Sequence, residues 1–567
     1  MLTTSFCEGP TDKLLLDLTM GGALDYAVTH FPERTAFIYP FEIAALTYKQ
    51  LHTKVCHVAA ALLSRGLRPG DQVVLWTDVH CMELEVFSHA VTYAGLILVG
   101  VFLIDIEDVL LNFSCKAIIF PNFTWEYTNR ESRLGRILGT TAASITDHET
   151  NTDSTASIAI LPNKTSGKGT FLSFKTLLDE GVTQQSHLSK VKKTIRADDV
   201  AVIMLTSGTT GKPKGVTSTH SSMVNNGYFI GDRLHYSSKE HRICSLMQRY
   251  DDIGLVEAMC AFMHGATIVN PERNYDVEDI TSVMQVIQNE RCTAVHGFPS
   301  HFVNIISDPA FTMYDFKAVH TGFTCAAPMF SRKMLEILTK FTPDLVPGFG
   351  TTETKRNIQG FVTDSRIKRA DTIGYPMPHT KVKIIDQESN IVPIGSAGEL
   401  CLYSYSTMVK YWNQPEKTSK AIDDEGWYHT GLTLSLTPTP NPNPNTTPNP
   451  NYSLTLSQSL TPTPNPNPNT IPNPNYSLTL SQSLTPNHNP NTTPNPNYSL
   501  TLSQSLTLTP YSNLNITPNP NYSLTLSQSL TLAPNPNPNT TPNPNYSLTL
   551  SQSLTLTPTL PLALSIA

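Results

Sequence analysis

The segment VAVIMLTSGTTGKPKGV, residues 200–216, decides both the fold class and the chemistry expected of this chain. Residues 200–205 form an unbroken apolar run of the length expected for a buried β-strand. The run leads directly into a loop of glycines, hydroxyl side chains and lysines. We therefore expect a strand that ends in a loop able to contact an anion.

This loop contains the groups that binding of a polyphosphate requires. Glycines let backbone N–H groups approach a ligand, hydroxyls donate hydrogen bonds, and ammonium groups supply positive charge. The candidate phosphate-binding residues are Thr206, Ser207, Gly208, Thr209, Thr210, Gly211, Lys212, Pro213 and Lys214. The spacing differs from a Walker P-loop, which has four residues between its first glycine and the Gly-Lys pair where this loop has two. A flexible surface turn is the alternative, but the length of the run after an apolar strand favours the anion site.

Helical and strand-like patterns alternate on both sides of this segment. Residues 46–67 have helical spacing that ends at Gly66, and strand-like runs follow at 72–76 and 115–121. The alternation resumes near residue 198 and continues to about residue 386. It predicts an α/β fold in which β-sheets are wrapped by helices. The polar residues 140–168 are expected to form a surface loop.

Composition excludes several classes of protein. The chain has 39 Lys and Arg against 46 Asp and Glu, a net charge of −7, which argues against a basic nucleic-acid binder. Its longest apolar run, residues 94–104, is shorter than the roughly 20 residues of a membrane span. The nine cysteines form no C-x-x-C pair, so we expect reduced thiols rather than a zinc or disulfide framework. Residues 1–13 lack the character of a signal or transit peptide.

The sequence changes character near residue 432. From Thr433 to Ala567 there is no Asp, Glu, Lys or Arg, and the unit PNPNYSLTLSQSL recurs. SLTLS alternates like a strand, but proline denies ladder hydrogen bonds, and the few leucines cannot offset roughly 1–2 kcal/mol of backbone entropy per residue. We expect a folded domain over 13–431 and a disordered, low-complexity tail over 432–567. The near-identical copies leave a translated DNA repeat open as an alternative.

TSGTTGKPKG resembles the phosphate-binding signature of the adenylate-forming superfamily of acyl-CoA synthetases, luciferases and peptide-synthetase adenylation domains. Further segments follow in the family's order. GFGTTE (348–353) resembles its adenine and magnesium motif, and GWYHTG (426–431) the start of its ribose-binding motif. Within the superfamily the chain is similar to medium-chain fatty acyl-CoA ligases of the acyl-CoA synthetase family member 2 type. That likeness is carried by MVNNGYFIGDRL (223–234), DPAFTMYDF (308–316) and MVKYWNQPEKTSKAID (408–423).

The resemblance implies a reaction in two steps. A fatty acid carboxylate attacks the α-phosphate of ATP to give acyl-AMP and pyrophosphate, and the thiol of coenzyme A then displaces AMP. ATP, Mg²⁺ and coenzyme A are the implied cofactor and co-substrates, and a mitochondrial location is implied by resemblance. The implied fold is a large N-terminal domain of stacked β-sheets wrapped by helices.

The family motifs also imply roles for single residues. Lys214, Thr352 and Glu353 are the candidate catalytic residues; Thr352 would contact the α-phosphate and Glu353 would ligate Mg²⁺. Phe349 would stack on adenine in the place of the usual tyrosine. The remaining candidates for the nucleotide and acyl pocket are Gly322, Gly350 and Thr351.

The chain departs from the family pattern at three points that bear on activity. Asp251 stands where the family has a histidine near the acyl site, and burying it would be costly unless it is protonated or paired, for example with Arg249. Leu432 replaces the aspartate that accepts hydrogen bonds from ribose, a loss of roughly 1–3 kcal/mol in nucleotide binding. Residues 433–567 contain no lysine and do not resemble the family's small C-terminal domain, which carries a catalytic lysine.

We therefore expect an acyl-CoA ligase by descent that is impaired in turnover. The alternative is a non-catalytic nucleotide- and acyl-binding protein that uses its tail for interactions.

Overall fold

The computed structural model describes eight stretches of the chain up to residue 438 and six short strands beyond it. The stretches are 4–77, 79–101, 106–121, 156–161, 170–206, 214–248, 251–272 and 279–438, and the strands are 452–455, 498–502, 507–508, 522–526, 531–532 and 554–555. The chain forms two compact units, Met1–Leu456 and Ser457–Ala567. Every residue of the candidate site belongs to the first unit.

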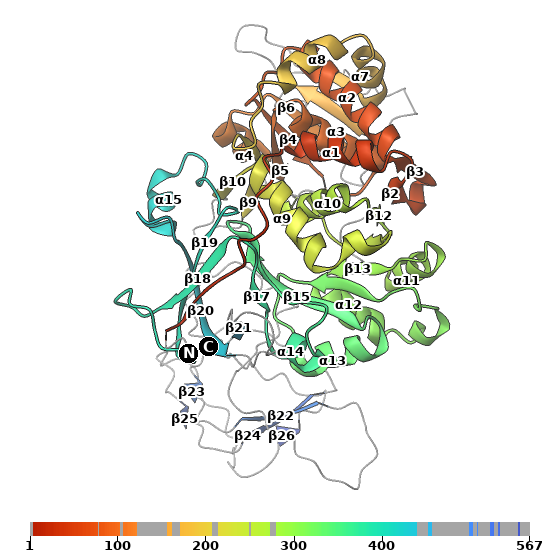
Figure 1. Cartoon of the computed structure of the whole chain (residues 1–567). Coiled ribbons are helices and arrows are strands. Elements are labelled where there is room, and N and C mark those ends of the chain that lie inside the picture. Colours follow the sequence, from red (N-terminus) through yellow and green to blue (C-terminus); the bar gives the residue numbers. More distant parts are fainter. Residues whose placement is uncertain are drawn as a thin grey trace, which may run out of the picture. The chain divides into compact units, whose positions relative to one another are not determined.

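A seven-stranded sheet with a parallel centre forms one layer of the larger unit (Figure 1). In spatial order its strands are β10 (Lys214–Thr219), β9 (Val200–Thr206), β5 (Ile97–Val101), β4 (Gln72–Trp76), β6 (Ala117–Pro121), β7 (Ala156–Ile160) and β8 (Thr170–Ser173). Strands β5, β4 and β6 are parallel to one another and buried along their whole length. Unbroken apolar strands of this kind need helices on both faces, which confirms the α/β fold expected from the sequence.

A nine-stranded sheet forms a second layer. Its order is β17 (Tyr375–Pro376), β16 (Lys355–Gln359), β15 (Asp344–Thr351), β14 (Thr321–Thr324), β13 (Ala294–Gly297), β11 (Arg242–Ser245), β12 (Thr267–Val269), β2 (Thr35–Tyr39) and β3 (Ala44–Thr47). Strands β13, β14 and β15 are parallel, whereas β16 returns antiparallel to β15. The turn between β15 and β16 therefore lies at the carboxyl end of a parallel strand, the edge at which α/β sheets bind ligands.

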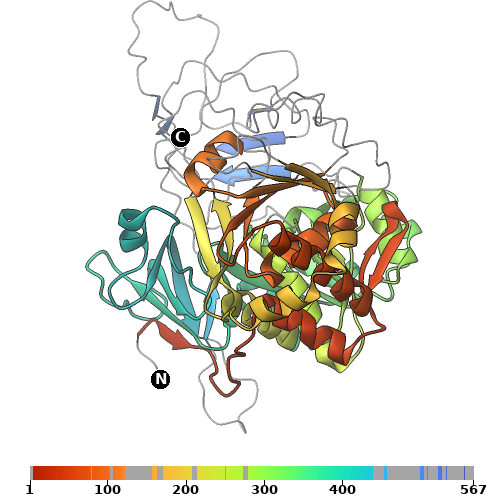
Figure 2. The same cartoon turned by 90° about the horizontal axis from the view of Figure 1, so that it is seen from above.

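A five-stranded antiparallel sheet completes the larger unit, in the order β1 (Phe6–Glu8), β18 (Thr380–Ile385), β19 (Ala397–Ser404), β20 (Tyr428–Pro438) and β21 (Tyr452–Thr455). Figure 2 shows β1, from the start of the chain, beside these late strands. The expected domain boundary at residue 432 falls inside β20. Leu434 and Leu436 are fully buried with Val382 and Leu400, so the first leucines after the boundary pack into the core of this sheet.

Helices cover and separate the first two sheets. They are α1 (Met20–His30), α2 (Tyr48–Ser64), α3 (Met82–Tyr93), α4 (Ile106–Phe113), α7 (Phe174–Gly181), α8 (Gln185–Lys192), α9 (His220–Arg233), α10 (Asp252–His264), α11 (Ile280–Asn289), α12 (Pro299–Ser307), α13 (Ser331–Lys340), α14 (Arg366–Asp371) and α15 (Pro415–Ala421). Helices α9 and α10 lie between the seven- and nine-stranded sheets (Figure 1). Their close packing depends on Gly227, where a Cβ would come within 2.6 Å of the Cys260 backbone nitrogen.

Local sequence signals account for several element boundaries. The helix expected within residues 46–67 is α2, which begins at a capping box of Thr47 and Gln50 and is followed by Gly66 at φ +93°. The prediction of a surface loop over 140–168 is wrong in part, because β7 lies within it and pairs with β6 and β8. Its small and β-branched residues, ASIAI, are compatible with that strand. The rest of that segment lies outside the described residues, apart from Leu161.

Two predictions from the composition, reduced thiols and the lack of a membrane span, can be compared with the structure. All nine cysteines are free thiols, eight of them buried and Cys56 partly buried. Among the described residues, no helix combines the length and the apolar character that crossing a bilayer requires.

The smaller unit contains short strands in the repeats. They are β22 (Tyr498–Leu502), β23 (Thr507–Leu508), β24 (Tyr522–Leu526), β25 (Thr531–Leu532) and β26 (Leu554–Thr555). Strands β22 and β24 pair in parallel, with each residue opposite its counterpart one repeat later. Disorder of the tail stays a prediction, since the residues between these strands lie outside the described part of the chain.

Candidate functional site

The glycine-rich loop is held at both ends by an antiparallel strand pair. Lys214 of β10 lies opposite Thr206 of β9, and Gly215 opposite Leu205. Gly215 has no room for a side chain, because a Cβ would come within 2.5 Å of the Phe113 ring. The residues of the loop itself, Ser207, Gly208, Thr209, Thr210, Gly211, Lys212 and Pro213, lie outside the described residues. The strands therefore fix where the loop leaves and re-enters the sheet, and the roles of its residues stay a prediction.

Tyr411 links the two charged candidates of the nucleotide motifs. The Nζ of Lys214 lies 4.7 Å from the centre of the Tyr411 ring, and the Tyr411 hydroxyl donates a 2.8 Å hydrogen bond to Oε1 of Glu353. Glu353 is only 9% exposed, and its backbone carbonyl accepts a hydrogen bond from the Met408 N–H at 2.6 Å. Burial and then the charge of Glu353 raise the pKa of Tyr411 far above its usual value, so its hydroxyl keeps its proton and donates.

Tyr411 was not predicted as part of the site. It lies in KYWNQP, a segment that indicates family likeness but carries no residue type typical of phosphate chemistry. A second tyrosine, Tyr428, is close enough to Glu353 for that carboxylate, together with burial, to raise the pKa of the phenol. The carboxylate expected to bind Mg²⁺ is therefore held in place by at least one phenolic hydroxyl.

The turn from β15 to β16 presents the other motif residues. Gly350 is required by close packing, since a Cβ there would come within 1.8 Å of the Lys355 carbonyl oxygen. The backbone N–H of Thr351 donates a 3.2 Å hydrogen bond to Oγ1 of Thr354, which stabilises the turn. Phe349 is partly buried and packs on the apolar cluster of the five-stranded sheet. Its stacking on adenine remains a prediction.

Gly322 has a structural requirement of its own. Its φ is +146°, and a Cβ would come within 2.0 Å of the Val295 carbonyl, so only glycine lets β14 approach β13 this closely. Gly322 does not line the cavity described below, although its neighbour Phe323 does. The glycine thus positions the strand that carries the cavity wall.

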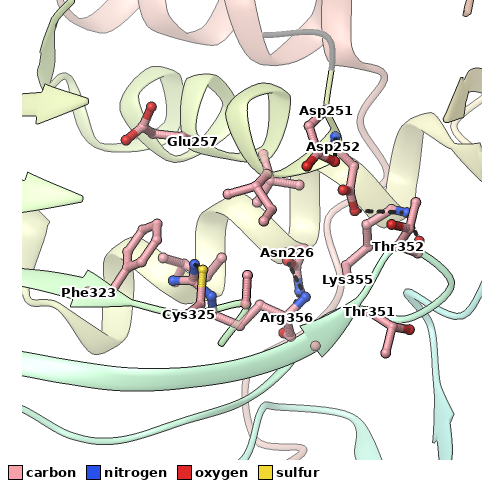
Figure 3. Close-up of a pocket in the computed structure, with 15 residues that line it drawn as sticks. Asn226, Asp251, Asp252, Glu257, Phe323, Cys325, Thr351, Thr352, Lys355 and Arg356 are labelled. Carbon is pink, nitrogen blue, oxygen red and sulfur yellow. Dashed lines mark hydrogen bonds and ion pairs between the residues drawn. The ribbon is translucent and has the colours of Figure 1, made fainter. Parts of the chain in front are cut away.

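A cavity of about 200 Å³ begins at this turn and continues between α9, α10 and β14 (Figure 3). Its lining residues are Asn226, Ile230, Asp251, Asp252, Ile253, Val256, Glu257, Phe323, Cys325, Ala326, Gly350, Thr351, Thr352, Lys355 and Arg356. Three of the predicted site residues, Gly350, Thr351 and Thr352, lie at this cavity. The cavity joins the motif turn to side chains that no sequence motif identified.

A buried ion pair stands beside Thr352. Lys355 places its Nζ 3.2 Å from Oδ2 of Asp252, and both side chains are almost completely buried. The same ammonium group donates to the backbone carbonyl of Thr352. Lys355 also adopts φ +59°, an unfavourable backbone conformation for a residue with a side chain. The pair therefore ties the start of α10 to the motif turn.

Asp251 caps helix α10. Its side chain accepts a 2.6 Å hydrogen bond from the Asp252 N–H. Burial raises the pKa of Asp251 well above its usual value, the neighbouring Asp252 raises it further, and Lys355 opposes the rise. The sequence led us to expect that a buried Asp251 is either protonated or paired with a cation, and the raised pKa fits the protonated form. Arg249, its expected partner, lies outside the described residues.

The far wall of the cavity is formed by an arginine on an aromatic ring. The Arg356 guanidinium lies 3.3 Å from the centre of the Phe323 ring and donates through Nη2 to Sγ of Cys325 at 3.3 Å. Figure 3 shows these three side chains at one end of the cavity and Lys355, Asp252 and Thr352 at the other.

Glu257, on α10, lines the cavity and belongs to a buried hydrogen-bond network. Its carboxylate accepts from Oγ of Ser245 at 2.5 Å and lies 2.7 Å from Nδ1 of His296, whose Nε2 is 2.6 Å from the Tyr236 hydroxyl.

Lys355 and Arg356 were missed because two basic residues after a motif resemble a solvated turn. The only signal was their position shortly after GFGTTE, at the start of a short strand, residues 355–359.

Comparison with known proteins gives one family match. The model of the family described as AMP-binding enzyme matches residues 24–412. The mitochondrial medium-chain acyl-CoA ligase ACSF2 of Danio rerio is 31% identical over 448 residues, which are 76% of this chain and 72% of that protein. The human ACSF2 is 31% identical over 446 residues, 75% of this chain and 71% of the relative. The acyl-CoA ligase sidI of Aspergillus fumigatus is 32% identical over 444 residues, 75% and 72% of the two chains.

Solved structures share the fold. The inhibitor-bound N-terminal domain of FACL13 from Mycobacterium tuberculosis superposes with a TM-score of 0.60 at 20% identity, over 78% of this chain and all of that one. ATP-bound MatB from Rhodopseudomonas palustris gives a TM-score of 0.60 at 18% identity, over 78% and 79% of the two chains.

Proposed function

Because the chain belongs to the family of AMP-binding enzymes, we propose that it is an ATP-dependent ligase that activates a carboxylic acid as its adenylate and transfers it to coenzyme A. One observation carries this proposal. The cavity of about 200 Å³ begins at Thr351 and Thr352, directly before Glu353 and beside the motif turn. An acid in the cavity would therefore hold its carboxylate next to a nucleotide bound at that turn.

Adenylation brings a carboxylate against a polyanion, so the site must cancel their repulsion. A carboxylate oxygen bonds to the α-phosphorus as the bond to pyrophosphate breaks. Lys214, at the end of the loop 207–213, supplies positive charge on the phosphate side, and Thr352 lies between that side and the cavity. Coenzyme A then displaces AMP from the acyl group through its thiol.

Glu353 fits the role of a magnesium ligand. Mg²⁺ prefers hard oxygen donors, and the Glu353 carboxylate is fixed by the Tyr411 hydroxyl at 2.8 Å. Bound there, Mg²⁺ would neutralise charge on the phosphates. Tyr411 orients the carboxylate by donating to one oxygen.

The size of the cavity favours a short or medium-length acid. A cavity of about 150 Å³ holds benzene, so one of about 200 Å³ takes an acyl group of roughly eight heavy atoms. We infer medium-chain acids as substrates, the class named for ACSF2, and a mitochondrial location like that of those relatives.

We also propose that turnover is slow. Leu432, 40% exposed on β20, cannot accept the ribose hydrogen bonds that the family's aspartate accepts. No lysine occurs in residues 433–567. The lack of lysine in residues 433–567 also favours the second candidate function, a protein that binds nucleotide and acid without turnover.

Acid-dependent pyrophosphate release by the purified full-length protein, with hexanoate, octanoate and decanoate, tests these proposals. We expect slow formation of acyl-AMP and then acyl-CoA, detected by mass spectrometry and strongly reduced in a Glu353→Gln control. Rapid turnover to acyl-CoA would remove the proposed impairment. Binding of ATP and acid with no acyl-AMP at all would overturn the ligase and support the binding protein.

A further inference from the structure

The far end of the acyl cavity carries a hydrogen-bond donor with nothing to donate to. Arg356 is 7% exposed, and its Nη1 has no hydrogen-bond partner among the described residues, while Nη2 donates to Cys325. Buried donors in folded proteins almost always have a partner, and a charged donor without one is costly. Since Arg356 is one of the residues that line the cavity, we look to a ligand bound there for the missing acceptor.

The guanidinium is held in position rather than left to move. The Asn226 side chain fixes the Arg356 backbone, since it accepts from the backbone N–H at 3.2 Å and donates to the backbone carbonyl at 2.8 Å, and the guanidinium itself donates through Nη2 to Cys325. The central guanidinium carbon of Arg356 lies 3.3 Å from the centre of the Phe323 ring. An arginine fixed in this way offers a planar, oriented donor and loses little side-chain entropy when a ligand binds.

The charged side chains near Arg356, in the described part of the chain, have hydrogen-bond or ion-pair partners other than Nη1. Lys355 is paired with Asp252, at the opposite end of the cavity (Figure 3). The Glu257 carboxylate is held by Ser245 and His296 on its two oxygens. Glu257 therefore balances charge near Arg356 without an observed hydrogen bond to Nη1.

We propose that the acid activated at this site carries an oxygen acceptor on its chain, a hydroxyl, an oxo group or a second carboxylate, which receives a hydrogen bond from Nη1 of Arg356. This inference rests on the proposed function, because it takes the reactive carboxylate to lie at the Thr352 end of the cavity. A plain fatty acid of the same length would cover the guanidinium with methylene groups and leave the donor unpaired. Since a hydrogen bond to a charged group is worth about 10- to 100-fold in affinity, the oxygenated acid binds more tightly by that factor.

Acyl-sulfamoyl adenosines, stable analogues of acyl-adenylates, test the proposal by equilibrium binding to the full-length protein. Four analogues of equal chain length are compared: the plain octanoyl compound and versions with a hydroxyl, an oxo or a carboxylate group near the far end. We expect at least one oxygenated analogue to bind about 10- to 100-fold more tightly than the plain one. The analogue with the largest gain identifies which oxygen the site accepts.

Arg356→Met separates donation from packing, because methionine keeps an unbranched apolar side chain against Phe323 without a donor. We expect this variant to lose the preference, so that the plain and the oxygenated analogues bind to it with equal affinity. Arg356→Lys, which keeps a charged donor, should retain part of the preference. If Arg356→Met does not fold, the comparison of analogues on the unmodified protein still decides the question.

The possible failures are distinct. Equal binding of all four analogues to the unmodified protein overturns this inference and leaves the proposed function standing. A preference that survives in Arg356→Met also overturns it. If neither the plain nor any oxygenated analogue binds, the proposed function fails as well.

Discussion

The two ends of the site are built on different principles. At the nucleotide end, Lys214 and Glu353 come from short continuous motifs and meet through one tyrosine hydroxyl and ring. At the acyl end, the charged groups come from helix α10 and strand β16 and are almost completely buried. Charges at the first end are placed to receive a charged ligand, whereas charges at the second must be balanced within the protein before any ligand arrives.

This difference decides what a substitution does. Removing a charge that acts on a ligand, while the hydrogen bonds of that side chain are kept, weakens ligand binding and leaves the fold largely intact. Removing one member of a buried pair leaves the other charge without compensation and destabilises the fold. The predictions below use that contrast, in order of decreasing effect.

Lys355→Met should have the largest effect and should act on stability. It leaves Asp252 buried without its partner at 3.2 Å, at a cost of about 3–5 kcal/mol. Thermal and denaturant unfolding of the full-length protein would measure it. The double variant Asp252→Asn with Lys355→Met removes both charges and should recover much of the loss; an equally unstable double variant would show that the ion pair is not the cause.

Glu353→Gln should act on binding and not on stability. Glutamine can still accept from the Tyr411 hydroxyl, but it lacks the charge that binds Mg²⁺. We expect ATP affinity in the presence of Mg²⁺ to fall about 10- to 100-fold with little change in the unfolding temperature. An unfolding temperature that falls as far as that of Lys355→Met would mean that Glu353 is a structural residue.

Leu432→Asp should improve nucleotide binding. Residue 432 is 40% exposed, so the new carboxylate remains solvated and able to accept from ribose hydroxyls. We expect about a tenfold tighter Kd for ATP, measured by calorimetry. Leu432→Ala, which removes the leucine without adding an acceptor, is the matched control and should leave the Kd unchanged; equal gains in both variants would point to steric relief instead.

Asp251→Asn should have the smallest effect and should depend on pH. The raised pKa of Asp251 means that the folded protein holds this carboxyl protonated where the unfolded chain has lost its proton. Its contribution to stability is therefore complete below the ordinary aspartate range and is lost as pH rises through the raised pKa. Asparagine can still cap α10 and cannot ionise, so the variant should gain stability relative to the unmodified protein as pH rises.

Acid binding gives a second measurement of the same variant. In the unmodified protein, ionised Asp251 repels the acid, so affinity should fall about 2- to 5-fold as pH rises, and Asp251→Asn should flatten that profile. Parallel profiles for both proteins would assign the pH dependence to another group.

The sequence proposed more residues for the nucleotide end than for the acyl end, and the roles of those residues stay predictions. TSGTTGKPKG and GFGTTE are continuous motifs, and each begins near the carboxyl end of a strand with a parallel neighbour, β9 beside β5 and β15 beside β14. The cavity was not predictable, because it depends on packing between α9, α10 and β14. Arg356 and Asn226 are 130 residues apart and come together only through that packing.

The boundary of the repeats shows a similar limit. Composition alone separates the residues after 432 from the body of the chain. Leu434 and Leu436, however, are two residues apart and point to one face of β20, which pairs with the edge of β19. Local pattern cannot reveal such an edge, since it exists only once the five-stranded sheet has formed.

The most direct test of the central claim is calorimetric titration of the full-length protein with MgATP, repeated on Lys214→Ala. The account predicts saturable binding that weakens about tenfold or more without the lysine ammonium group. Absence of binding heat in displacement-controlled titrations, or an unchanged Kd in the variant, would contradict it.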